Sequence, residues 1–186
     1  MAPVTIASVV EGHGEVTGLP KVLYSIAKQF SIPVLQVPRP HRIPRESLIK
    51  AGGIERAVAA EANRVSGVGG VLVVLDADDD CPAQLGPSLL SRARAARPDK
   101  RVSVVLPNIE FEAWFIAAAS SIGGRCGLPN GLEVPSNPEG IRDAKGSLTY
   151  RRTDGLQYSP TVDQATLASA TCRWAASSAI ASPTCA

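Results

Sequence analysis

The chain has 186 residues, enough for one domain with a substantial buried core. Its 19 basic and 17 acidic residues leave a net charge of +2, so no overall electric field requires nucleic acid or a membrane as a partner. We identify no signal segment, no apolar run long enough to cross a bilayer, and no CxxC pair or zinc-ligand spacing among the four cysteines. We therefore expect a cytoplasmic protein with no membrane partner.

Apolar runs rich in β-branched residues alternate with helical patterns over about the first 120 residues. The predicted strands lie in residues 4–10, 32–37, 69–80 and 101–107. The predicted helices cover residues 15–30, 54–65, 86–97 and 109–120. This alternation is typical of βαβ units, so we expect an α/β fold with a parallel sheet of about four strands and helices on both faces.

The pattern weakens beyond residue 122, which divides a predicted α/β domain (1–122) from a C-terminal extension (123–186). Residues 123–140 are dense in Gly, Pro and Asn and predict a long loop or a small irregular lobe. Residues 142–170 are basic and predict one short helix near their end. After about residue 170 the composition shifts to small residues, and we expect an aberrant or disordered tail.

Acidic residues follow two of the predicted strands. Glu11 ends the first strand and Asp76 ends the third. In an open parallel sheet, ligands bind beyond the carboxyl ends of the strands. The two acids meet only if the first and third strands are neighbours, which predicts the strand order 2-1-3-4. Asp78 lies two residues after Asp76 and points to the same side if the backbone there is extended.

Several carboxylates at one edge repel each other and raise each other's pKa values unless a cation joins them. Mg²⁺ suits such a place, because it binds one or two carboxylates and keeps water and phosphate oxygens as further ligands. Gly12 and Gly14 allow the backbone to approach closely at this turn. The sequence thus predicts a site for Mg²⁺ or Mn²⁺.

Two motifs, "VVEGHGE" and "LDADDD", resemble the signature of the Toprim domain, the catalytic module of topoisomerases, primases and OLD-family nucleases. Together with "NIEFEAWF", in this order, they look most like a family of small bacterial Toprim-related proteins. The resemblance implies a Toprim-like, Rossmann-like fold in which Glu11 is the general acid or base, while Asp76 and Asp78 hold Mg²⁺. It also makes Glu15 and Asp80 further metal ligands, with Glu110 and Glu112 as additional candidates.

The activity implied is Mg²⁺-dependent phosphodiester hydrolysis on nucleic acid, DNA more than RNA, in phage defence or DNA repair beside a partner ATPase. Water is the expected nucleophile, because no tyrosine stands in a nucleophile motif. One alternative is a non-catalytic scaffold that binds metal or nucleic acid within a complex. Another is a small-molecule phosphatase or nucleotide hydrolase that uses the same acids.

Other candidates have simpler alternative explanations. Glu110 and Glu112 also suit the first turn of a helix capped by Asn108. His13 is a candidate for contact with phosphate or metal, but between two glycines it could equally be only exposed. A basic stretch leaves the second strand on the side of the acids and predicts contacts to backbone phosphates, the alternative being a solvated loop. Its members are Arg39, His41, Arg42, Arg45 and Lys50, and the same surface could also include Arg142, Lys145, Arg151 and Arg152.

Overall fold

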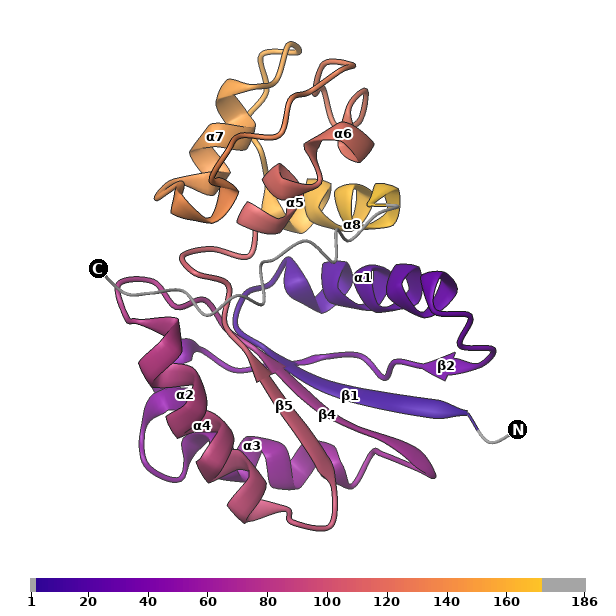
Figure 1. The fold of residues 1–186 in the computed structure, drawn as a ribbon, viewed down its shortest axis with the longest axis vertical. Helices are drawn as coiled ribbons and strands as arrows, with labels where there is room; N and C mark the ends of the chain where they lie inside the picture. The colour runs from indigo at the N-terminus through magenta and orange to yellow at the C-terminus, as the bar shows by residue number, and fades with distance from the viewer. Residues whose placement is uncertain (1–2, 172–186) are drawn as a thin grey trace.

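The computed structural model describes residues 3–171. Figure 1 shows a parallel sheet flanked by helices on both faces, with further helices stacked beyond one of them. The predicted α/β fold is confirmed. The expected aberrant tail after residue 170 lies almost wholly outside the described residues. Within residues 3–171 the longest and most apolar helices fall short of what a membrane span requires.

The strands all run parallel. They are β1 (Val4–Val10), β2 (Leu35–Gln36), β3 (His41–Arg42), β4 (Val68–Val74) and β5 (Arg101–Val105). The order β2-β1-β4-β5 confirms the predicted order, because β4 and β5 are the predicted third and fourth strands. The predicted second strand is reduced to β2, and β3 pairs separately with the end of β1. The register joins Val10 to Val74, so β1 and β4 end together.

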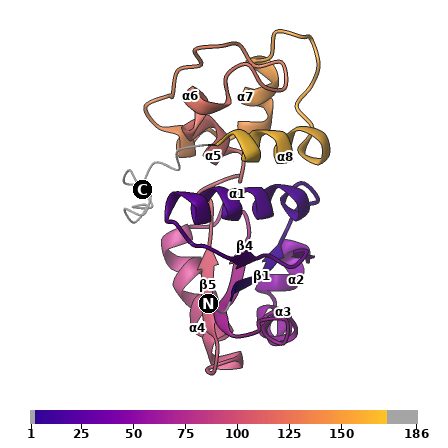
Figure 2. The ribbon, with the colours of Figure 1, turned by 90° about the vertical axis from the view of Figure 1, so that its right-hand side faces the viewer.

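Strand β1 and the second half of β4 are largely buried on both faces, which explains their runs of valine. Helix α1 (Glu15–Gln29) covers one face of the sheet (Figures 1 and 2). Val10 and Val74 pack in the core cluster on that side, whereas Val9 and Val73 pack in the cluster beneath the other face. The helices covering that second face are α2 (Arg45–Ile49), α3 (Gly53–Ala62) and α4 (Pro82–Ala96).

The C-terminal part is more helical than predicted. It contains α5 (Ala113–Ala117), α6 (Ala119–Ile122), the 3₁₀ helix η1 (Pro138–Gly140), α7 (Ala144–Tyr150) and α8 (Pro160–Ala170). Where one short helix was predicted in residues 142–170, the structure has two. Helix α8 lies along the outer side of α1 (Figure 2), which places α1 between the sheet and the C-terminal helices.

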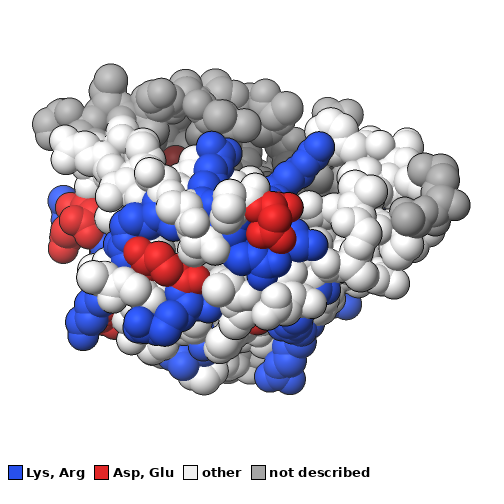
Figure 3. Space-filling view, turned by 90° about the horizontal axis from the view of Figure 1, so that it is seen from below, with Lys and Arg blue, Asp and Glu red and all other residues white. Residues whose placement is uncertain are grey.

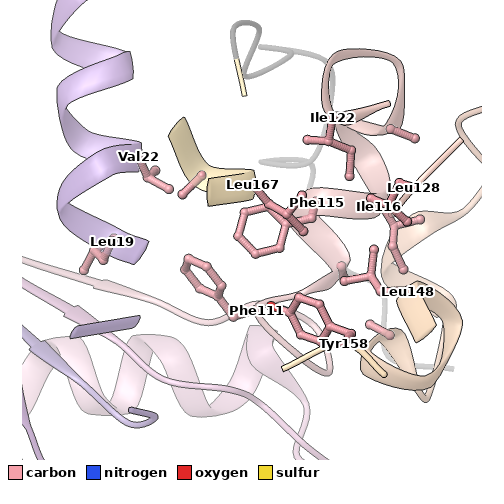
Figure 4. Close-up of a cluster of buried hydrophobic side chains, with 14 of the residues drawn as sticks. Leu19, Val22, Phe111, Phe115, Ile116, Ile122, Leu128, Leu148, Tyr158 and Leu167 are labelled. Atoms are coloured by element: carbon pink, nitrogen blue, oxygen red, sulfur yellow. The ribbon is translucent and has the colours of Figure 1, made fainter. Parts of the chain in front are cut away.

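One hydrophobic cluster joins α1 to the C-terminal helices (Figure 4). Leu19 and Val22 come from α1, Phe115 from α5 and Leu167 from α8, and all four are buried. The ring of Phe111 meets that of Phe115 edge-on, with centroids 5.6 Å apart. Side chains from both sides of residue 122 thus share one core, while the division of the chain into two units at that residue stays a prediction.

Helices α1 and α8 come unusually close at Gly14, just before α1. A Cβ atom there would lie 1.7 Å from the side-chain oxygen of Gln164 and 2.8 Å from the carbonyl oxygen of Pro160. Gln164 is fully buried, so it cannot move out into solvent. The glycine is therefore required by packing.

We expect Gly14→Ala to destabilise the protein by about 1–3 kcal/mol, the usual effect of overpacking a core. Gly86→Ala is the matched control, because a Cβ atom there would meet only Leu106 at 3.8 Å. Within a helix that control should be neutral or slightly stabilising. Chemical denaturation of both variants measures the difference. Equal stabilities of the two variants would show that α8 does not pack tightly against this turn.

Candidate functional site

The turn between β1 and α1 is built around a buried glutamate. The Gly12 amide donates a hydrogen bond to the Glu15 carboxylate, and the Glu15 side chain closes back over the turn. A Cβ atom at position 12 would lie 2.8 Å from Glu15 Oε1, so a larger residue here would displace the Glu15 carboxylate. Glu15 is only 8% exposed, and this burial raises its pKa despite the hydrogen bond from Gly12. A carboxyl group therefore lies at the start of α1, where the helix dipole favours a negative charge.

The turn after β4 brings Asp76 against the end of β1. The Asp76 amide donates to Glu11 Oε2 at 3.3 Å, and Asp76 Oδ1 accepts from the Phe111 amide at 2.8 Å. Asp76 is thus held between the segments that follow β1 and β5. The predicted meeting of Glu11 and Asp76 occurs because β1 and β4 are neighbours that end in register.

Asp76 carries the most perturbed carboxyl group of this edge. Burial, and then the negative charge of Glu15, raise the pKa of Asp76 from 3.8 to about 8, against the opposing effect of Lys145. Burial and the nearby Asp78 also raise the pKa of Glu11. Burial and mutual repulsion thus both disfavour the simultaneous ionisation of these carboxyl groups.

The two other predicted metal ligands, Asp78 and Asp80, face Arg45. The φ angle of Asp78 is +52°, so the backbone is not extended and the expected alternation of side chains fails. Arg45 donates to the carbonyl oxygens of Asp76 at 3.0 Å and Ala77 at 3.2 Å. Its guanidinium group also pairs with Asp80 and, at 3.5 Å, with Asp78. Arg45 fixes this turn and balances the charge of both acids.

A lysine from α7 bridges the two glutamates that follow β5. Lys145 Nζ lies 3.1 Å from Glu110 Oε1 and 3.4 Å from Glu112 Oε2, and its amide donates to Glu110 Oε2 at 3.2 Å. Tyr158 donates its hydroxyl hydrogen to Glu112 at 3.3 Å. Glu112 is 1% exposed, and burial raises its pKa. Burial alone would lower the pKa of Lys145, yet Glu112 and Glu110 raise it above its usual value.

The capping explanation for Glu110 and Glu112 is not what this geometry shows. The Asn108 side chain donates to the carbonyl oxygen of Glu139 at 3.0 Å, and α5 begins only at Ala113. The two glutamates instead anchor α7 through Lys145. We use "acid edge" for these two glutamates together with Glu11, Glu15 and Asp76.

We expect Lys145→Met to destabilise the protein by about 1–3 kcal/mol, because it leaves Glu112 buried beside Glu110 without a cation. The loss should be larger at pH 7 than at pH 4, because the raised pKa of Glu112 favours its neutral form as the pH falls. Lys21→Met, on an exposed position of α1, is the control. Urea denaturation at the two pH values makes the comparison. An equal loss at both would show that Lys145 contributes packing rather than charge.

The remaining predicted contacts are dispersed. His13, Arg39, His41 and Arg42 are exposed. His41 Nδ1 lies 3.3 Å from the Glu61 carboxylate, away from the acid edge on α3. Arg42 pairs in register with Val10, and its positive charge acts to lower the pKa of Glu15. Two members of the basic stretch act on the acid edge: Arg42 on Glu15, and Arg45, which is engaged in the turn, on Glu11.

Sequence reasoning missed the roles of Lys145 as counter-ion, Tyr158 as hydrogen-bond donor and Gln164 as packing partner of the α1 turn. Lys145 had been placed only among possible phosphate contacts. The signal that could have found it is the pair Glu110 and Glu112 in an apolar segment, which needs a cation once buried.

The donor set of the acid edge suits a hard cation, but the side chains do not form a closed cage. In residues 3–171, groups of three or more His, Cys, Asp or Glu side chains arranged to hold a metal ion are absent. Asp76 and Glu15 nevertheless offer crowded carboxylate oxygens of raised pKa. This fits Mg²⁺, which needs only one or two carboxylates beside water and phosphate oxygens.

A comparison of the chain with protein-family models, curated proteins and solved structures found no match. The Toprim resemblance therefore stays a prediction carried by the three motifs.

Proposed function

We propose that the acid edge catalyses Mg²⁺-dependent hydrolysis of phosphodiesters in nucleic acid. The observation that supports this most is Asp76, a carboxyl group beside Glu11 whose pKa is raised to about 8 by burial and then by the negative charges of Glu15 and Glu11. Crowding of this kind is unfavourable without a cation and is typical of functional sites. Its place beyond the carboxyl ends of neighbouring parallel strands is where α/β sheets bind their ligands.

Asp76 and Glu15 are the residues proposed to hold the ion. Bound Mg²⁺ or Mn²⁺ supplies positive charge that stabilises ionised carboxylates and the phosphate oxygens. Glu11 is proposed to accept the proton of the attacking water, a task helped by a pKa raised towards neutrality. Arg42, exposed and close enough to influence Glu15, is proposed to contact the substrate phosphate.

Nucleic acid is the proposed substrate because two exposed arginines lie close together in this segment. Arg39 precedes β3, and Arg42 is the last residue of β3. Such contacts give affinity without reading base sequence. The preference for DNA over RNA, the role in phage defence or repair and the partner ATPase rest on the Toprim resemblance alone.

The test is cleavage of end-labelled single-stranded and duplex DNA and RNA with Mg²⁺ or Mn²⁺. We expect cleavage of at least one substrate, lost on adding a chelator and lost in Asp76→Asn. Asp79→Asn is the control, because Asp79 is exposed and its side chain pairs, among residues 3–171, only with exposed Arg142 at 3.5 Å. A cleavage activity that survives in Asp76→Asn would come from elsewhere.

A second candidate function is a non-catalytic scaffold that binds metal or nucleic acid. The observation in its favour is Arg45, which already balances Asp78 and Asp80 and so occupies two of the predicted ligands. Binding of nucleic acid without cleavage of any member of the panel would favour the scaffold.

A further inference from the structure

A basic groove lies at the opposite end of the sheet from the acid edge. It encloses about 540 Å³ between the last turn of α4 and the start of β5. Its lining residues are Arg94, Pro98, Lys100, Arg101, Val102 and Ser103. Figure 3 views the molecule from below and shows Lys and Arg side chains distributed over that face, with acidic groups between them.

The groove carries three positive charges and no negative one among its lining residues. The nearest acid along the chain is Asp99, and Arg97 engages it with two hydrogen bonds of 2.7 and 2.8 Å. Asp99 is therefore neutralised outside the groove. The charge of Lys100 also acts on Asp99, whereas Arg94 and Arg101 form no ion pair within residues 3–171.

The side chains of these cations retain hydrogen-bond donors for a ligand. Arg94 Nε makes one long contact of 3.4 Å with the carbonyl oxygen of Val102, and Lys100 donates to that of Val65 at 3.2 Å. The Arg101 side chain forms no hydrogen bond or ion pair with any of residues 3–171. Two guanidinium groups thus leave most of their N–H groups available within one concavity, and guanidinium is the group that matches phosphate oxygens in pairs.

We propose that this groove binds a phosphate-bearing anion, either a free phosphate compound or the backbone of a nucleic acid. Cations along an edge strand also discourage pairing with another chain, and in the described part of the fold β5 is such an edge. That role needs no concavity, however, and no cation from α4. The convergence of Arg94 from α4, Lys100 from the turn before β5 and Arg101 from the first position of β5 favours an anion site.

This inference does not rest on the proposed hydrolysis. Arg101 opens β5, whereas the acid edge follows the other ends of the strands. Loss of metal-dependent cleavage in Asp76→Asn would leave anion binding at the groove unchanged, and a failure at the groove would leave the acid edge untouched.

The test compares the wild type with Arg94→Gln/Arg101→Gln, using pyrophosphate and a fluorescein-labelled single-stranded DNA as probes, both without divalent metal. We expect the double variant to bind at least one probe about tenfold or more weakly, the effect of losing charge-assisted hydrogen bonds. Lys21→Gln/Arg125→Gln removes the same charge from exposed positions elsewhere and should bind as the wild type does.

The two probes identify the source of the phosphate. Loss of pyrophosphate binding indicates a free phosphate compound, while loss confined to DNA indicates a nucleic-acid backbone. Arg101→Gln alone should also weaken binding, and it is expected to fold normally because its side chain holds nothing in place. The inference is overturned if the wild type binds neither probe, or if the groove variant and the control variant bind both equally.

Discussion

Glu11→Gln is expected to lower the rate of metal-dependent phosphodiester cleavage by about 10²–10⁴-fold, the usual contribution of general acid–base catalysis. Glutamine keeps the size of the side chain and an oxygen that can accept the Asp76 amide, now 3.3 Å from Glu11 Oε2. It cannot accept a proton from water. The turn should therefore remain intact while the proton acceptor is lost.

Single-turnover cleavage of the best substrate from the DNA and RNA panel measures this effect. Nucleic-acid affinity and Mn²⁺ affinity should stay close to those of the wild type, because Glu11 is proposed to act on the proton. Glu133→Gln, at an exposed position, is the matched control and should cleave normally. Wild-type rates in Glu11→Gln would remove this residue from the mechanism.

Asp76→Asn is expected to make the metal-free protein more stable than the wild type at pH 8. The pKa of Asp76 is about 8 in the folded protein and 3.8 for the ordinary side chain. Between these values the unfolded chain has released a proton that the folded chain retains, so the wild type loses stability as the pH rises from about 4 to about 8. Asparagine does not ionise, and its oxygen can still accept the Phe111 amide.

Thermal unfolding between pH 5 and 9 tests this, first without divalent metal and then with Mn²⁺. The advantage of Asp76→Asn should be small at pH 5 and largest near pH 8 and above. Mn²⁺ should stabilise the wild type more at pH 8 than at pH 6, since metal binding displaces the proton. A constant difference between the two proteins at every pH would mean that Asp76 is not the group with the raised pKa.

The sequence was sufficient to place Glu11 beside Asp76. Acids that end two buried valine-rich runs can meet only if those strands are neighbours, and this reasoning predicted both the strand order and the contact. Each step uses the polarity of a parallel sheet, which the alternation of strands and helices already determines.

Local backbone geometry limited the prediction for Asp78. Its side chain was expected to join Asp76 because alternate residues of an extended strand share a side. The strand β4 ends at Val74, and the turn that follows carries Asp78 with φ at +52°. Arg45, which holds this turn, comes from a segment distant in sequence, so no local pattern indicates the contact.

The other features that were not predicted depend on contacts made by the C-terminal helices. Lys145 reaches Glu110 and Glu112 from α7, a helix that the sequence did not predict separately from α8. The packing of α8 against the side of α1 that faces away from the sheet was also missed. Gly14 and Gly18 lie on that side of the segment. Both glycines lie against Gln164 of α8, and this spacing of small residues was the available signal.

The most direct test of the proposed metal site is a titration with Mn²⁺ followed by electron paramagnetic resonance at pH 8. The wild type, Glu11→Gln and Asp79→Asn should bind Mn²⁺ at a saturable site, which Mg²⁺ displaces. Asp76→Asn should show only free Mn²⁺ over the same range. Saturable binding that persists in Asp76→Asn, or no binding by the wild type, would contradict a metal site at the acid edge.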